Sequence, residues 1–228
     1  MSRPPAKPAS PGEIARFLDK QRNLQAFAGR SPRLLFAIDA TASRQPTWDL
    51  ACQLQGEMFL ATERLASLSV QLCYYRGLGE FQATPWTGSA SALARAMSRV
   101  QCAAGQTQLT RVLRHALAEH RQQPVRAVVF IGDAMEERPS PLAALAGECG
   151  LRRLPLFLFQ EGGQPAVTAC FDRLAGLSGG ARLDFDRGSA DRLASLLGAV
   201  ARYAAGGREA LEKSASEGAR LLLEKLKP

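Results

Sequence analysis

The chain has 228 residues, of which 46% are apolar and 22% charged, and its formal net charge is +8. These values exclude a chain that is disordered throughout, and they are typical of one globular domain of about 100–200 residues with short extensions. No stretch reaches the roughly 18 consecutive apolar residues that a membrane span needs, and the first ten residues lack the hydrophobic core of a secretory signal. We therefore predict a cytoplasmic protein with no membrane span.

The positive charge is concentrated at the amino terminus. Residues 1–33 hold seven Lys and Arg residues against two acids, Glu13 and Asp19. The Pro-rich start and the amphipathic pattern over residues 12–28 predict a basic arm and a short helix, together forming residues 1–32. A basic arm can contact nucleic acid, but few aromatic residues are interleaved here and no recognised nucleic-acid motif follows. We expect no nucleic-acid partner.

Apolar residues in the rest of the chain follow two alternating patterns. Continuous apolar runs of strand length alternate with segments in which apolar residues recur every three or four positions, as they do on one face of a helix. Strands are predicted at residues 34–38, 70–75, 125–131, 154–159 and 182–185, with an edge strand near Phe81. Helices are predicted at residues 48–68, 90–100, 108–120, 142–150, 167–177 and 190–203.

This alternation predicts the fold class. Strands that are apolar on both sides occur where helices cover both faces of a mostly parallel sheet. We therefore expect an α/β protein with a doubly wound, Rossmann-like sheet over residues 33–205. Two glycines then end the unit, and residues 206–228 show the pattern of one amphipathic helix. This helix either packs on its own domain or contacts a partner, and both interpretations stay open, as does the oligomeric state.

The cysteines do not indicate a metal or disulfide framework. There are five of them, and none lies two or three residues from another. An odd number without close pairs is typical of buried thiols rather than of disulfides or a zinc knuckle.

Oxygen-bearing side chains follow two of the predicted strands. Asp39, Thr41 and Ser43 stand at alternate positions after the first strand, and Asp133 follows the third long strand. In an open parallel sheet, ligands bind outside the carboxyl ends of the strands, where the strand order reverses. Thr107, which precedes a predicted helix, adds a further hydroxyl. Carboxylates and hydroxyls are hard ligands that suit Mg²⁺ or Mn²⁺, so we predict that these five residues form a metal site.

These five residues resemble the metal-ion-dependent adhesion site of von Willebrand factor type A domains. The signature of that site is Asp-x-Ser/Thr-x-Ser, followed by a distant Thr and a distant Asp. Residues 171–184 also look like the late helix, the Gly-Gly turn and the final strand of the family. The resemblance covers about residues 33–205 and is to the intracellular, bacterial type of this domain.

The resemblance implies a non-enzymatic function in protein binding. Hydroxyls at Thr41, Ser43 and Thr107 would ligate Mg²⁺ (or Mn²⁺) directly, and Asp39 and Asp133 would act directly or through water. One coordination position would then be left for a carboxylate of another protein. Neutral hydroxyls leave much of the 2+ charge uncompensated, which favours such an acidic ligand. The implied function is a metal-dependent adhesion or assembly module.

Two places depart from the family pattern. Thr41 stands where Ser is commoner, and it keeps the hydroxyl. The loop after Asp133 carries Glu136 and Glu137 in place of the more usual Gly. We interpret these two acids as a solvated rim rather than as metal ligands.

Other interpretations of the same residues remain. Asp39 could cap the following turn and Thr107 the following helix. The domain could be an assembly module with a vestigial metal site, in which the basic arm and the terminal helix contact the partner. Asp39 could also be the nucleophile of a Mg²⁺-dependent phosphohydrolase. Against this, such enzymes need a second Asp at the position of Thr41, and no Lys lies between Lys20 and Lys213.

Overall fold

The computed structural model describes residues 31–62, 65, 67–185 and 190–226. The predicted basic arm and the helix at residues 12–28 lie outside this part. The described residues form a six-stranded sheet with the strand order β3-β2-β1-β4-β5-β6. All neighbouring strands are parallel except β2 and β3, which are antiparallel. The strands are β1 (Arg33–Asp39), β2 (Ser69–Arg76), β3 (Glu80–Ala83), β4 (Val125–Gly132), β5 (Leu156–Glu161) and β6 (Ala181–Phe185).

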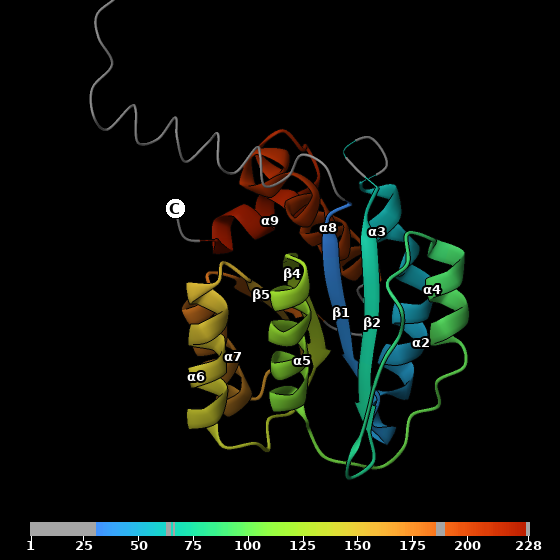
Figure 1. The fold of residues 1–228 in the computed structure, drawn as a ribbon, viewed down its shortest axis with the longest axis vertical. Coiled ribbons are helices and arrows are strands. Elements are labelled where there is room, and N and C mark those ends of the chain that lie inside the picture. Colours follow the sequence, from blue (N-terminus) through green and yellow to red (C-terminus); the bar gives the residue numbers. More distant parts are fainter. Residues whose placement is uncertain (1–30, 63–64, 66, 186–189, 227–228) are drawn as a thin grey trace, which may run out of the picture. The chain divides into compact units, whose positions relative to one another are not determined.

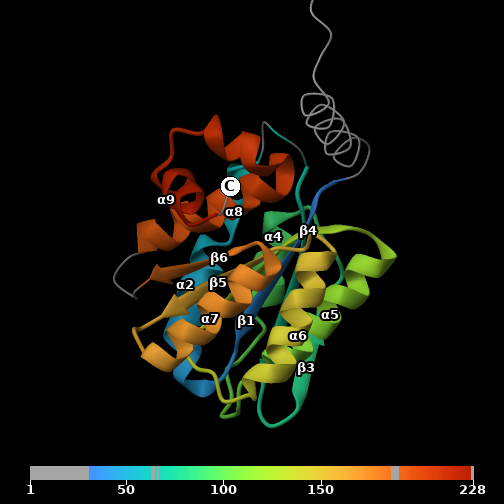
Figure 2. The same ribbon diagram turned by 90° about the vertical axis from the view of Figure 1, so that its left-hand side faces the viewer.

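Helices cover both faces of this sheet (Figures 1 and 2). One face carries α5 (Leu109–Gln122), α6 (Pro139–Leu151) and α7 (Pro165–Ser178). The opposite face carries α2 (Gln45–Leu54), α3 (Gly56–Leu60), α4 (Ala90–Met97) and α8 (Ala190–Glu212). The doubly wound α/β fold expected from the alternating pattern is confirmed, and the antiparallel edge strand near Phe81 is β3.

The central strand β1 explains why this arrangement is stable. Leu34, Phe36 and Ile38 pack in one hydrophobic core, and Leu35 and Ala37 pack in the other. All five are at most 1% exposed. Burying a side chain of this size stabilises a fold by about 1.5–3 kcal/mol, so β1 joins two cores and cannot lie at the edge of the sheet.

The strand order reverses between β1 and β4. The chain passes from β1 to β2 on one side of the sheet, and from β4 to β5 and β6 on the other. In such sheets the two connections leave in opposite directions and open a crevice outside the carboxyl ends of the strands. This edge is at the lower end of β1 and β2 in Figure 1.

Two predicted helices differ from the structure. The long helix expected at residues 48–68 is divided into α2 and α3 at Gln55, which itself keeps αR dihedral angles and is followed by Gly56. Glycine in a helix interior is unfavourable by roughly 0.5–1 kcal/mol relative to Ala, so the helix is easily interrupted at Gly56.

Among the described helices, none is long and apolar enough to cross a membrane.

The predicted carboxy-terminal helix is also two helices. The first part belongs to α8, which bends at Gly207, a residue with the positive φ of 68° that glycine adopts readily. The second part is α9 (Glu217–Lys225), whose side chains Ala219 and Leu222 are buried in the core that also contains α8. The described part of this segment therefore packs on the domain itself.

The contact between α8 and α9 is close. The backbone N–H of Gly218 donates to the Ser195 hydroxyl at 2.9 Å. A Cβ added at Gly218 would lie only 2.2 Å from the Ser195 carbonyl oxygen. The absence of a side chain at this position thus allows the two helices to touch.

We predict that Gly218→Ala lowers the free energy of unfolding by about 1–3 kcal/mol, because overpacking forces the two helices apart. The matched control is Gly147→Ala in α6, where no atom lies within 4 Å of the added Cβ. This control should stabilise the protein by about 0.5–1 kcal/mol through helix propensity. Urea unfolding measures both changes. An unchanged midpoint for Gly218→Ala would contradict the close helix contact.

Candidate metal centre

Asp39 is the last residue of β1 and is 1% exposed. Its Oδ1 accepts the backbone N–H of Thr41 at 2.7 Å, so the carboxylate is fixed by its own loop. Burial raises the pKa of Asp39, and the hydrogen bonds from Thr41 partly oppose this rise. A carboxylate that keeps its charge at such a place is held at an energetic disadvantage that a cation would relieve.

The next two predicted ligands lie on the loop after β1. Thr41 is buried and directly precedes the short 3-10 helix η1 (Ala42–Arg44). Its carbonyl oxygen accepts the Arg44 N–H at 2.9 Å, which is the first hydrogen bond of this helix. Ser43 lies within η1 and is exposed. The turn therefore keeps one hydroxyl inside the molecule and one at its surface.

Asp133 follows β4 and lies beside Asp39. The register pairs Ile38 with Ile131, so both aspartates stand at neighbouring strand ends. A Cβ added at Gly132 would lie 3.9 Å from the Cβ of Asp39. The charge of Asp133 also contributes to the raised pKa of Asp39, which places the two carboxylates within electrostatic reach. Two acids held together in this way repel each other unless a positive charge is near.

Thr107 is buried in the loop that precedes α5 and is tied to the loop after β4. Its N–H donates to a carboxylate oxygen of Glu136 at 3.1 Å, and its hydroxyl accepts the Glu136 N–H at 3.1 Å. The same loop is joined to the end of β1, because the Ala103 N–H donates to the Ala40 carbonyl at 3.0 Å. Three separate loops thus bring all five predicted residues to one edge of the sheet.

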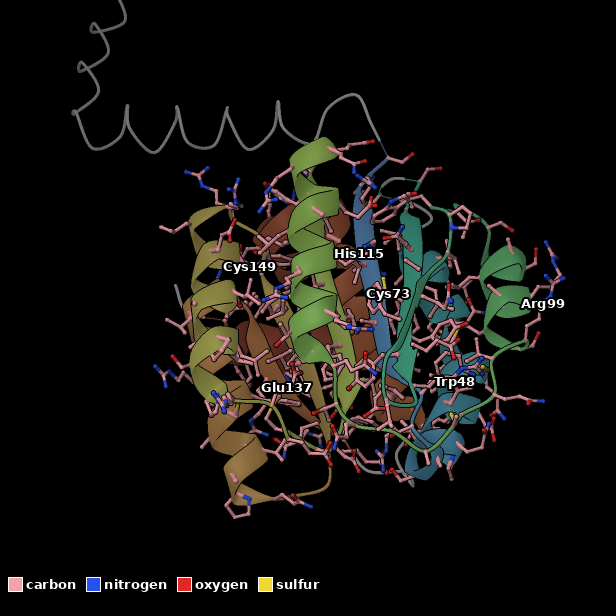
Figure 3. The ribbon with its side chains drawn as sticks, turned by 60° about the horizontal axis from the view of Figure 1, so that its bottom comes forward. Trp48, Cys73, Arg99, His115, Glu137 and Cys149 are labelled. Carbon is pink, nitrogen blue, oxygen red and sulfur yellow. The ribbon has the colours of Figure 1, made fainter. Side chains whose placement is uncertain are left out.

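The acids after Asp133 reach solvent, as the sequence pattern indicated, since Glu136 is exposed and Glu137 half-buried, but both also accept backbone N–H groups of another loop. Glu136 pairs with Thr107 as described, and both carboxylate oxygens of Glu137 accept the Thr110 N–H at 3.1 and 3.2 Å. Figure 3, in which this edge comes forward, labels Glu137 at the start of α5. The first turn of a helix has unpaired N–H groups and a partial positive charge, so Glu137 caps α5 from another loop, while Glu136 holds the loop residue Thr107 that precedes the helix.

A charged residue that the sequence reasoning missed lies among the predicted ligands. Arg44 has a side chain that is 4% exposed, and its guanidinium forms ion pairs with Asp133 at 2.8 Å and with Glu161 at 2.5 Å. The Thr47 hydroxyl donates to the same Glu161 oxygen. An Arg is rarely buried unless it is paired with an acid. The burial of Arg44 is visible only in the structure. Its position directly after Ser43 gave no indication of its acidic partners.

Buried polar atoms without an ordinary hydrogen-bond geometry gather at this edge. Within the described residues they include the Gln108 Oε1 and the Arg44 Nε, whereas the Tyr75 hydroxyl interacts with the Asp39 carboxylate and lowers its pKa. Tyr75 is paired in register with Asp39, and the amide nitrogen of Gln108 donates to the Gly77 carbonyl at 3.3 Å. Of these atoms only the Gln108 oxygen is an acceptor without a donor, which is costly when buried and which a cation or an ordered water would satisfy.

The donor set is compatible with a hard divalent cation. It comprises the two carboxylates and three hydroxyls predicted from the sequence, and the orphaned oxygen of Gln108 lies at the same edge. Oxygen donors of this kind suit Mg²⁺ or Mn²⁺ better than softer metals. Among the described residues, no group of three or more His, Cys, Asp or Glu side chains is placed to hold a metal ion, so the candidate site has only two carboxylates and depends on hydroxyl donors for the rest.

Comparison with solved structures adds to this geometry. The chain superimposes on a von Willebrand factor type A protein from Catenulispora acidiphila with a TM-score of 0.63 at 16% identity, covering 78% of this chain and 43% of that one. The chain has the von Willebrand factor type A fold. No protein-family model and no curated protein match the sequence.

Two further structures share the fold. The SpRpn10 VWA domain has a TM-score of 0.57 at 12% identity, covering 72% of this chain and 95% of that one. Proximal thread matrix protein 1 from the mussel byssus, whose MIDAS motif is occupied by zinc, has a TM-score of 0.56 at 15% identity, with 85% and 52% coverage. The chain thus spans less than half of the first relative and nearly all of the SpRpn10 domain.

We predict that Asp39→Asn raises the free energy of unfolding at pH 7.5 in the presence of a chelator. The pKa of Asp39 is raised by burial, so the wild-type fold must keep a poorly solvated charge, whereas Asn retains the oxygen that accepts the Thr41 N–H. A carboxyl whose pKa is higher in the folded state binds more protons when folded. The difference in free energy of unfolding between Asp39→Asn and wild type should therefore become smaller as the pH falls towards 4.5.

Urea unfolding of both proteins between pH 7.5 and 4.5 measures this difference. A variant that is less stable than wild type by the same amount at every pH would show that the Asp39 charge imposes no cost.

We also predict that Glu137→Ala costs about 0.5–2 kcal/mol of stability, because α5 loses an acceptor for its first-turn N–H groups. Glu212→Ala is the control, since Glu212 is exposed and forms a surface pair with Arg208 on the same helix. Exposed pairs of this kind contribute at most about 1 kcal/mol. Thermal unfolding compares the two variants. Equal effects would indicate that Glu137 does not cap α5.

Proposed function

We propose that this domain is a protein-binding module that captures a carboxylate of its partner through a divalent cation, Mg²⁺ or Mn²⁺. The ion would be held by Asp39, Thr41, Ser43, Thr107 and Asp133. The observation that carries the proposal is that Asp39 and Asp133 lie side by side where the strand order reverses, with the buried Thr41 on the loop directly after Asp39. Ordinary helix capping does not explain why two acids stand side by side at neighbouring strand ends.

The exposure of each side chain indicates which part of the site it would form. Asp39 and Thr41 are buried and fixed to each other, so they would form the floor of the site. Ser43 is exposed and Asp133 is partly exposed, so they would form its rim. When bound, the ion supplies positive charge for an incoming carboxylate, because hydroxyl donors compensate little of it. The fold positions this charge at the surface and needs no bond-breaking step.

A second candidate is an assembly module whose metal site is vestigial. The specific observation in its favour is the ion pair between Arg44 and Asp133, which balances one carboxylate without any metal. In that case the partner would contact other surfaces of the domain, and chelators would have no effect on binding.

A metal titration distinguishes the two candidates. We expect saturating Mg²⁺ or Mn²⁺ to raise the melting temperature of the chelator-treated protein by about 5–10 °C, since a ligand at 100 times its dissociation constant adds about 2.7 kcal/mol. Asp39→Asn should abolish the rise. Asp49→Asn, a change at an exposed aspartate of α2, should keep it.

The same proteins test the partner. Immobilised wild type and Asp49→Asn should retain a protein that is lost with Asp39→Asn and when wild type is washed with chelator. A partner retained equally in all four samples, together with an unchanged melt, would leave the vestigial-site alternative.

A further inference from the structure

The residue that follows the predicted ligands in sequence has no place in the signature discussed above. Arg44 is one residue beyond Ser43, at the end of η1, and its side chain turns inward rather than to solvent. Arginine is almost never fully buried unless acids surround it. This burial is therefore a structural feature that needs an explanation.

The guanidinium is held from two neighbouring strands. One nitrogen contacts Oδ2 of Asp133, which follows β4, and another contacts Oε2 of Glu161, the last residue of β5. Glu161 is itself buried and also accepts the Thr47 hydroxyl of α2. The arginine therefore has a fixed position, set by β5 and α2, from which it reaches the rim of the candidate metal centre.

The charges at this edge explain what the arginine does. Asp133 lies beside Asp39, Asp133 and Glu161 both contact Arg44, and no lysine occurs between Lys20 and Lys213. Breaking a buried pair leaves an uncompensated charge, which is strongly destabilising. Arg44 thus keeps Asp133 neutralised and the loops in place when no ion is bound.

The same contact opposes the binding of a metal. A divalent cation drawn to Asp133 meets a guanidinium that already holds this carboxylate at 2.8 Å. Like charges at such separations repel each other strongly where water is largely excluded. Glu161 reduces this repulsion by sharing the charge of the arginine.

We propose that Arg44 is an internal counter-cation that competes with the divalent ion for Asp133 and so sets the ion concentration at which the site fills. This inference rests on the proposed function. It makes the domain a module whose fold persists without metal but whose partner-binding state requires the ion to overcome an internal ion pair.

The test compares Mn²⁺ affinities by calorimetry in purified variants of the full chain. Arg44→Gln combined with Glu161→Gln removes the pair while keeping hydrogen-bonding groups of similar size. We expect this double variant to bind Mn²⁺ at least tenfold more tightly than wild type. Glu161→Gln alone should bind it several-fold more weakly, because the whole guanidinium charge then faces Asp133.

The matched control is a second buried Arg–Glu pair, which joins the first residue of β1 to α5. Arg33 and Glu119 lie 2.5 Å apart at the opposite end of that strand, with side chains 7% and 17% exposed. Arg33→Gln combined with Glu119→Gln should leave Mn²⁺ affinity unchanged. Circular dichroism and thermal unfolding confirm that each variant is folded.

The outcomes are distinguishable. If Mn²⁺ binds wild type but binds the Arg44/Glu161 double variant equally or more weakly, the counter-cation is wrong while the metal site stands. If the double variant binds Mn²⁺ at a much lower concentration than wild type does, the proposal holds. Absence of Mn²⁺ binding to both proteins overturns the counter-cation and the proposed function together.

Discussion

The structure depends on the parallel pairing of β1 with β4 at the centre of the sheet. Both strands are buried on their two faces, so neither can shift in register without moving apolar side chains out of a core. Their carboxyl ends therefore stay together, and with them Asp39 and Asp133. Hydrophobic burial of the strands thus supplies the free energy that holds two acidic side chains beside each other. Every property proposed for this edge follows from that enforced proximity.

The surrounding loops show how such a site stays folded. Glu137 satisfies an N–H group in the first turn of α5, Glu136 satisfies one in the loop before it, and Arg44 joins the loop after β1 to Asp133 and Glu161. These contacts give four of the acids at this edge, Asp133, Glu136, Glu137 and Glu161, a hydrogen-bond or ion-pair partner. The orphaned oxygen of Gln108 is a deviation from full pairing in the same place, and unsatisfied polar groups of this kind concentrate at functional sites.

The proposed function and the counter-cation describe one equilibrium. Without an ion, the guanidinium of Arg44 neutralises Asp133 and the domain keeps its fold. With an ion, positive charge moves to the surface, where the exposed Ser43 marks the rim. The vestigial-site alternative corresponds to an equilibrium that lies wholly on the side of the ion pair. The difference between a working site and a vestigial one is then a matter of relative affinities for Asp133, within a single architecture.

The sequence by itself determined the alternation of strands and helices, because buried strands and amphipathic helices leave different apolar periods. It also placed both aspartates at strand ends, and the resemblance of their motifs implied the fold that the structure shows. Only the tertiary structure decided the partners of Arg44, since Glu161 lies 117 residues away and nothing local to either residue indicates the other. The capping of α5 by Glu137 and the close packing of Gly218 on Ser195 were hidden for the same reason. Periodicity reports which face of an element is buried, whereas the choice among charged and polar partners depends on which loops the completed sheet brings together.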